Sequence, residues 1–141
     1  FAESTAVRAS VAATHARLED AGSRDALAAH IDRGVIEVFF VAFLRDVDDP
    51  ARERMGVTWR KRSNLAKRYV IVSAAARETT LAHELGHFLG NGHTSVLDNL
   101  MSYERDGGPV SLDAMQGAKS RRTARDLFAR GALDAQRTAR P

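Results

Sequence analysis

The eleven residues "HELGHFLGNGH" (His83–His93) hold three of the five histidines of the chain, with one glutamate and three glycines. On a helix, His87 lies one turn after His83 on the same face, so the two imidazoles can converge on one metal ion. Glu84 projects about 100° around the helix from His83, beside such an ion, where it can accept a proton from water. The stretch therefore predicts a helix with a metal site on one face.

The glycines explain how a third histidine can join the first two. A straight helix would place His93 on the wrong face, about 9 Å beyond His87. Gly90 can adopt the left-handed conformation that ends a helix, so that His93 turns back as a third ligand, and Gly86 lets another segment approach. Three protein ligands leave one position open for water, as in catalytic zinc sites. The alternative is a set of surface histidines beside an ordinary glycine cap.

Hydrophobic periodicity predicts the elements around this helix. We expect a helical N-terminal segment (Ser4–Arg33) that can split at Gly22-Ser23 and ends at Gly34. Strands are expected next, the first buried on both faces: Val35–Leu44, Gly56–Arg60 and Tyr69–Ser73. The histidine-bearing helix should begin at a capping Thr79 or Thr80, reach about Leu89 and pack its apolar stripe (Leu81, Leu85, Phe88, Leu89) on the sheet. After an irregular stretch (Asn91–Gly108), Ser111 should cap a final helix over Leu112–Arg130 that stops at Gly131, and the polar tail runs to Pro141.

Composition limits the classes of protein that need consideration. The 141 residues suit one α+β domain, and 21 basic against 18 acidic residues leave a net charge of +3. The basic clusters have no recognisable nucleic-acid-binding module around them, so we expect no nucleic acid partner and mainly solvated surfaces: Arg60–Arg62, Lys67–Arg68 and Arg121–Arg125. The absence of cysteine excludes disulfides, thiolate zinc sites and cysteine catalysis. The longest apolar run, Val35–Leu44, is too short to span a membrane.

These residues resemble the metzincin clan of zinc metallopeptidases. The clan signature H-E-x-x-H-x-x-G-x-x-H stands here as His83, Glu84, His87, Gly90 and His93. The resemblance implies that the three histidines bind one catalytic Zn²⁺ and that Glu84 is the general base. Whether Ca²⁺ or a second zinc also binds is left open. The stretch Arg45–Pro50 has carboxylates that could bind calcium, but it is expected to form a solvated turn.

A second mark of the clan follows the signature. Met101, eight positions after His93, matches the methionine of the clan's Met-turn, with a spacing similar to that of the matrixins. The stretch "LMSY" is similar to the serralysin turn, which implies that Tyr103 touches the metal and stabilises the oxyanion. The alternative for Tyr103 is a wall of the specificity pocket. Thr94 matches none of the common family choices, so the family within the clan stays open.

The resemblance also implies a fold of two subdomains, an upper one over about residues 1–90 and a lower one over about 91–141. Metzincins usually have five strands in the upper subdomain, whereas three are evident here. Either further strands lie in Ser4–Arg33 and Asp46–Arg54, or the fold is reduced. A substrate peptide would pair with an edge strand, for which the candidate is Gly56, Val57, Thr58 and Trp59. Trp59 is equally suited to the core. Arg60–Arg62 beside this strand could also favour acidic substrates.

The function that the resemblance implies is that of a zinc endopeptidase, in which a zinc-bound water attacks the peptide bond and Glu84 accepts its proton. One alternative is a peptidase of narrow specificity or one that processes itself, since a chain that starts at Phe1 is compatible with a lost pro-segment. The other is an inactive zinc-bearing binding module. We expect a monomer that acts on a peptide or protein and, by analogy alone, is secreted or extracellular.

Overall fold

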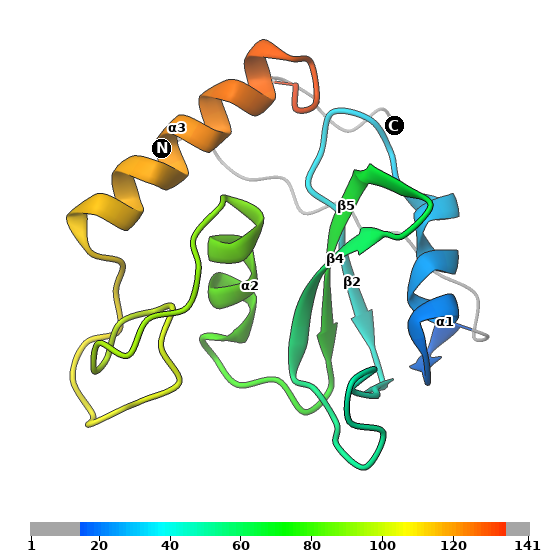
Figure 1. Ribbon diagram of the computed structural model, residues 1–141, viewed down its shortest axis with the longest axis horizontal. Helices are drawn as coiled ribbons and strands as arrows, with labels where there is room; N and C mark the ends of the chain where they lie inside the picture. Colours follow the sequence, from blue (N-terminus) through cyan, green and yellow to red (C-terminus); the bar gives the residue numbers. More distant parts are fainter. Residues whose placement is uncertain (1–14, 135–141) are drawn as a thin grey trace, which may run out of the picture.

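The protein is a mixed α+β domain in this computed structural model, which describes residues 15–134. Figure 1 shows its elements in chain order: β1 (Arg17–Leu18), α1 (Ala21–Ala26), the 3₁₀ helix η2 (Leu27–His30), β2 (Val38–Val41), β3 (Phe43–Leu44), β4 (Gly56–Lys61), β5 (Asn64–Ser73), α2 (Thr80–Phe88) and α3 (Ala114–Ala129).

The central sheet has the strand order β2-β5-β4, with β2 parallel and β4 antiparallel to β5. β4 is therefore an edge strand of this sheet. The short strands β1 and β3 pair in parallel as a separate ribbon. Figure 1 shows α1 on one side of the sheet and α2 on the other, with α3 beyond α2. The expected mixed sheet between an N-terminal helix and the histidine-bearing helix is thus present.

Strand β5 separates two apolar clusters because successive side chains of a strand point to opposite faces. Tyr69 and Ile71 face α1 and pack with Leu18, Leu27 and Phe39. Val70 and Val72 face the other way and pack with Phe88 of α2 and with Leu127 and Leu133 at the C-terminal end. The predicted stripe of α2 lies in this second cluster, since Leu81, Leu85 and Leu89 also contact it.

Within the described residues, the helix expected over Ser4–Arg33 is confirmed only over 21–30, as α1 and η2. Residues 1–14 and the expected tail over 135–141 lie outside the described part of the chain. Within 15–33, Arg17–Leu18 forms a strand, and Gly22 lies inside α1 instead of splitting a helix. Tertiary pairing overrides helix propensity here: Leu18 is fully buried and pairs with Leu44 of β3.

The strand expected over Val35–Leu44 is shorter and is divided into β2 and β3. It is also not buried on both faces, because Phe39 and Val41 are buried whereas Phe40 is 74% exposed. The continuous apolar run therefore predicted the wrong burial for Phe40, since α2 packs on β4 and β5 and makes few contacts with β2. Of the further strands sought in Asp46–Arg54, only an isolated bridge between Arg45 and Glu53 forms.

The strands expected at Gly56–Arg60 and Tyr69–Ser73 are confirmed as β4 and β5, and β5 begins earlier, at Asn64. The helix caps differ from expectation. Neither Thr79 nor Thr80 caps α2 with its hydroxyl, because Thr79 makes no such bond and Thr80 Oγ1 accepts from the backbone of Arg77. The cap of α3 is not Ser111 but Asp113, which exchanges hydrogen bonds with Gln116 in a capping box.

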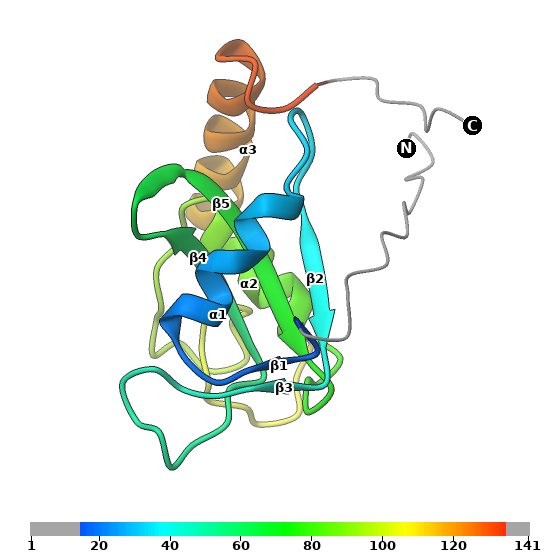
Figure 2. The ribbon, with the colours of Figure 1, turned by 90° about the vertical axis from the view of Figure 1, so that its right-hand side faces the viewer.

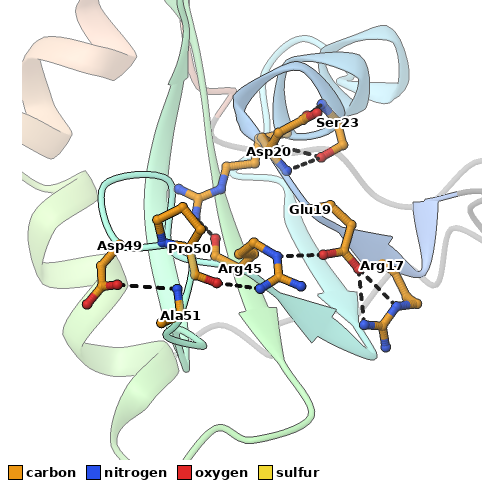
Figure 3. Close-up of polar contacts among 9 residues, drawn as sticks. Arg17, Glu19, Asp20, Ser23, Arg45, Asp49, Pro50 and Ala51 are labelled. Carbon is orange, nitrogen blue, oxygen red and sulfur yellow. Dashed lines mark hydrogen bonds and ion pairs between the residues drawn. The ribbon is translucent and has the colours of Figure 1, made fainter.

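Polar contacts fasten the β1–β3 ribbon to the loop that precedes β4. Figure 3 shows the Arg45 guanidinium donating to the Glu19 carboxylate, at 2.7 Å, and to the Pro50 carbonyl. Farther along the loop, Asp46 pairs with Arg54 at 2.8 Å, and Asp49 accepts from the backbone of Ala51. These carboxylates serve the turn that the sequence predicts. The side-on view in Figure 2 shows the ribbon and this loop at one end of the sheet.

The segment between α2 and α3 contains no regular element, as expected, and is held to α3 by two amides. The Asn91 side chain donates to Ser120 Oγ at 2.8 Å, and the Asn99 side chain donates to Gln116 Oε1 at 2.8 Å. Among the described residues, no helix is long and apolar enough to cross a membrane.

Gly90 ends α2 with φ +92°, in the left-handed region that a residue with a side chain rarely adopts. We therefore expect Gly90→Ala to lower the free energy of unfolding by about 1–2 kcal/mol. Gly92→Ala is the matched control, because a Cβ there meets nothing within 4 Å and Gly92 is not among the residues of positive φ. Urea unfolding of both variants measures the difference. Equal stability of the two would contradict this account of the turn.

Candidate metal centre

Three imidazoles meet at one point of the structure. The Nε2 atoms of His83 and His87 lie 3.1 Å apart, and His93 Nε2 lies 3.3 Å from the first and 3.0 Å from the second. His83 is buried, His87 is half-buried and His93 is exposed, so the group opens toward solvent on one side. In residues 15–134, no other group of three histidine or carboxylate side chains is close enough to hold a metal ion.

Backbone carbonyls fix which nitrogen of two imidazoles faces this point. His83 Nδ1 is 2.7 Å from the Leu100 carbonyl, and His87 Nδ1 is 2.9 Å from the Asn91 carbonyl. Because a carbonyl only accepts, each Nδ1 carries the proton and donates it, which leaves the Nε2 lone pair free. Metal-binding histidines are oriented in this way.

The donor set fits a divalent metal ion. The Nε2 acceptors of His83 and His87 lie 3.1 Å apart, and His93 Nε2 lies 3.0–3.3 Å from both, so a shared cation would offset the repulsion between their lone pairs. Nitrogens bound at 2.0–2.1 Å to a tetrahedral ion lie about 3.3 Å apart, close to the separations here. Partial desolvation of its ring, together with the neighbouring His87 and His83, lowers the pKa of His93, which favours the neutral form that a metal requires.

The predicted close approach at Gly86 is confirmed, and the approaching segment is Met101. A Cβ at Gly86 would lie 2.4 Å from Met101 Sδ, so this pair requires glycine. Met101 is fully buried, and its backbone N–H donates to Asn99 Oδ1 at 2.8 Å. Met101 thus packs under α2 directly after Leu100, whose carbonyl orients His83.

Glu84 lies beside the histidines and is held by β4. Thr58 Oγ1 lies 2.6 Å from the Glu84 backbone carbonyl and 3.1 Å from Glu84 Oε2. Gly56 provides the space for this contact, since a Cβ there would lie 2.9 Å from Glu84 Cγ and 2.8 Å from Thr80 Cγ2. The carboxylate is almost fully buried. Glu84 is therefore held in one orientation at the edge of the site.

Tyr103 extends to the same point. Its hydroxyl lies 2.8 Å from His93 Nε2, and its ring is 4.8 Å from that of His93. The residue as a whole is exposed, but its hydroxyl is directed at the histidines. Desolvation there, followed by the charge of Glu84, raises the pKa of Tyr103. The phenol therefore stays protonated at neutral pH and can donate a hydrogen bond.

Two pockets flank the histidines. The one along the edge strand, here called the β4 pocket, has a volume of about 310 Å³ and is lined by Arg54, Gly56, Val57, Thr58, Arg60, Arg68, Glu84, His87, His93 and Tyr103. The larger loop pocket, of about 760 Å³, lies toward the start of α2 and the 102–105 segment. Both include Gly56, Glu84, His93 and Tyr103, so together they form a depression that passes the metal site.

The expected cleft residues divide between the two faces of β4. Gly56 and Thr58 face α2 and the site. Trp59 lies on the other face, where it packs against the cluster around Tyr69 and its indole N–H donates to Asp25 at 2.8 Å. Trp59 is therefore a residue of the core, as the alternative expectation had it. Val57 lines the β4 pocket and also packs against the same core cluster.

Sequence reasoning missed several residues that orient the site. Thr58 was expected to touch substrate, whereas its hydroxyl holds Glu84. Asn91 and Asn99 were treated as parts of an irregular stretch, yet they anchor the histidine acceptors to α3. The sequence carried one signal for them, since two asparagines in a glycine-containing loop are suited to bond backbone groups.

The sequence matches no protein-family model, and a comparison with curated proteins finds no significant match.

We expect the purified protein to bind one divalent ion and His93→Ala to weaken this binding by more than the 10- to 100-fold typical of losing an outer-sphere partner. The reason is that one of three ligands is lost. Titration with zinc, followed by calorimetry, measures the affinity. The matched control is His30→Ala, an exposed histidine of η2 outside the group. Equal losses in both variants, or none in either, would contradict the assignment.

Proposed function

We propose that the protein is a zinc-dependent endopeptidase of the metzincin type. The observation that carries the proposal is the convergence of three Nε2 atoms within 3.0–3.3 Å beside the buried, oriented carboxylate of Glu84. A binding module would need the three ligands but not a fixed general base. We infer zinc because it favours neutral imidazole in three-ligand sites with an open position.

The arrangement of the strands supports the metzincin resemblance. β4 is antiparallel, lies at the sheet edge and borders α2, as the analogy requires of the strand that binds substrate. Met101 packs beneath the histidine helix, where the resemblance expects the Met-turn. The strand number differs from the usual five, since the described residues form a three-stranded sheet and a separate two-stranded ribbon.

The reaction would be hydrolysis of a peptide bond. Zinc, when bound by the three histidines, supplies Lewis acidity that polarises a carbonyl and lowers the pKa of water. Glu84 accepts one proton from the attacking water as its oxygen bonds to the carbonyl carbon. The same carboxylate then returns the proton to the amine as the C–N bond breaks. Tyr103 donates a hydrogen bond to the developing oxyanion, because its hydroxyl points to the site and its raised pKa keeps it protonated.

An extended substrate would lie along β4. The edge strand offers backbone groups that no other described strand uses, and a peptide can pair with them as an added strand. The two pockets would then take side chains from either side of the scissile bond. The narrow or self-processing peptidase shares this chemistry and differs only in its range of substrates.

Glu84→Gln is expected to lower kcat by roughly 10²- to 10⁴-fold, because the amide cannot accept the proton. Zinc stoichiometry should stay the same, since Glu84 is not a ligand. Asp126→Asn, the same change of charge on the exposed face of α3, is the control and should keep full activity. Mass spectrometry of a digested peptide library measures turnover. A wild-type protein that binds one zinc and cleaves nothing would favour the binding module.

Tyr103→Phe is expected to lower kcat by about 100-fold with little change in KM, because the hydrogen bond forms mainly in the transition state. Steady-state kinetics on one cleaved peptide separates the two constants. A higher KM at unchanged kcat would instead identify Tyr103 as a wall of the specificity pocket.

A further inference from the structure

Two of the arginines that line the β4 pocket lie side by side on neighbouring strands. Arg60 of β4 pairs directly with Arg68 of β5 in the antiparallel register. Both lie on the face of the sheet that carries Thr58 and the site, because side chains alternate along β4 and directly opposed residues share a face. Like charges placed directly opposite each other destabilise a sheet. This pair therefore has an electrostatic cost that a bound anion would relieve.

Arg68 is confined on this face. Its guanidinium carbon lies 4.0 Å from the centre of the Phe88 ring of α2, and the side chain is half-buried. Desolvation, followed by the charges of Arg60 and Arg130, lowers the pKa of Arg68 to about 10. At neutral pH the guanidinium is still charged, held in place by a ring and surrounded by cations.

Neither arginine has an acidic partner within residues 15–134. The ion pairs found there occupy other arginines, including Arg54, which bonds Asp46, and Arg62, which bonds Asp25. Arg54, the third arginine of the pocket, is thus already neutralised. The sequence suggested that the cluster Arg60–Arg62 could favour acidic substrates. Arg62 is paired with Asp25 of α1, so the arginines of the pocket that remain for such a substrate are Arg60 and Arg68.

We propose that Arg60 and Arg68 together bind a carboxylate side chain of the substrate, which makes the protein selective for Asp or Glu near the cleaved bond. The inference rests on the proposed peptidase function. The direction of β4 also predicts on which side of the cleaved bond the acidic residue lies. β4 runs from Gly56, beside Glu84, toward Lys61, so an antiparallel peptide has its N-terminal half along Arg60. The acidic residue is therefore expected within about three residues before the scissile bond, given a rise of about 3.4 Å per residue.

Cleavage-site profiling of a peptide library by the zinc-loaded protein tests this directly. We expect Asp and Glu to be enriched before the cleaved bond. For a matched pair of peptides made from the preferred sequence, kcat/KM should be about tenfold higher with Glu than with Gln. This ratio should fall toward unity in Arg68→Gln and in Arg60→Gln, and it should decrease with salt. Arg122→Gln, the same substitution at an exposed site on α3, should keep it.

Cleavage without enrichment of acidic residues, or a Glu/Gln ratio that survives both pocket substitutions, would overturn the inference and leave the peptidase intact. Zinc stoichiometry and the unfolding temperature show whether each variant is folded. If Arg68→Gln is unstable, Arg60→Gln serves as the second variant, because Arg60 is exposed and its replacement disturbs less packing.

If wild type cleaves no peptide, the peptidase proposal fails. The pocket is then judged by fluorescence anisotropy of labelled Glu-rich and Gln-rich peptides on the zinc-loaded protein. Preference for the Glu-rich peptide that Arg68→Gln abolishes supports the pocket, and equal binding overturns it.

Discussion

The reversal of the chain at Gly90 is the constraint on which the site depends. It brings His93 back to within 3.0–3.3 Å of two histidines that a single helix turn has already aligned. Without the positive φ of this glycine, α2 would continue and the third imidazole would point elsewhere. The three Nε2 atoms that meet there could share one cation, so this turn of the backbone creates the candidate metal site.

The remainder of the fold holds this cluster from three directions. From the sheet, Thr58 fixes Glu84, and Gly56 leaves room for it. From beneath, Met101 packs against Gly86 and positions the Leu100 carbonyl behind His83. From α3, Asn91 and its bond to Ser120 support the carbonyl that orients His87. The side chains of Asn91 and Asn99 thus tie to α3 the segment whose carbonyl groups orient two imidazoles.

The histidine cluster could be predicted from the sequence, whereas the structure of the N-terminal part could not. The histidine cluster follows from local rules, namely the helix period, the positive φ of glycine and the chemistry of imidazole. All three can be applied to the spacing of His83, His87 and His93 in the sequence. Leu18, in contrast, sits in a helix-favouring context and becomes a strand only because Leu44, far along the chain, pairs with it. Phe40 was expected to be buried, because the apolar run does not reveal that α2 packs on β4 and β5 and makes few contacts with β2. Thr58 and Arg68 act through contacts with α2 that no local pattern encodes.

The most direct test of the central claim is X-ray absorption spectroscopy at the zinc edge of the purified, zinc-loaded protein. The account predicts one zinc per chain with three imidazole nitrogens at about 2.0–2.1 Å and a light-atom ligand at the remaining position. A protein that takes up no zinc, or a spectrum without histidine scattering, would contradict it.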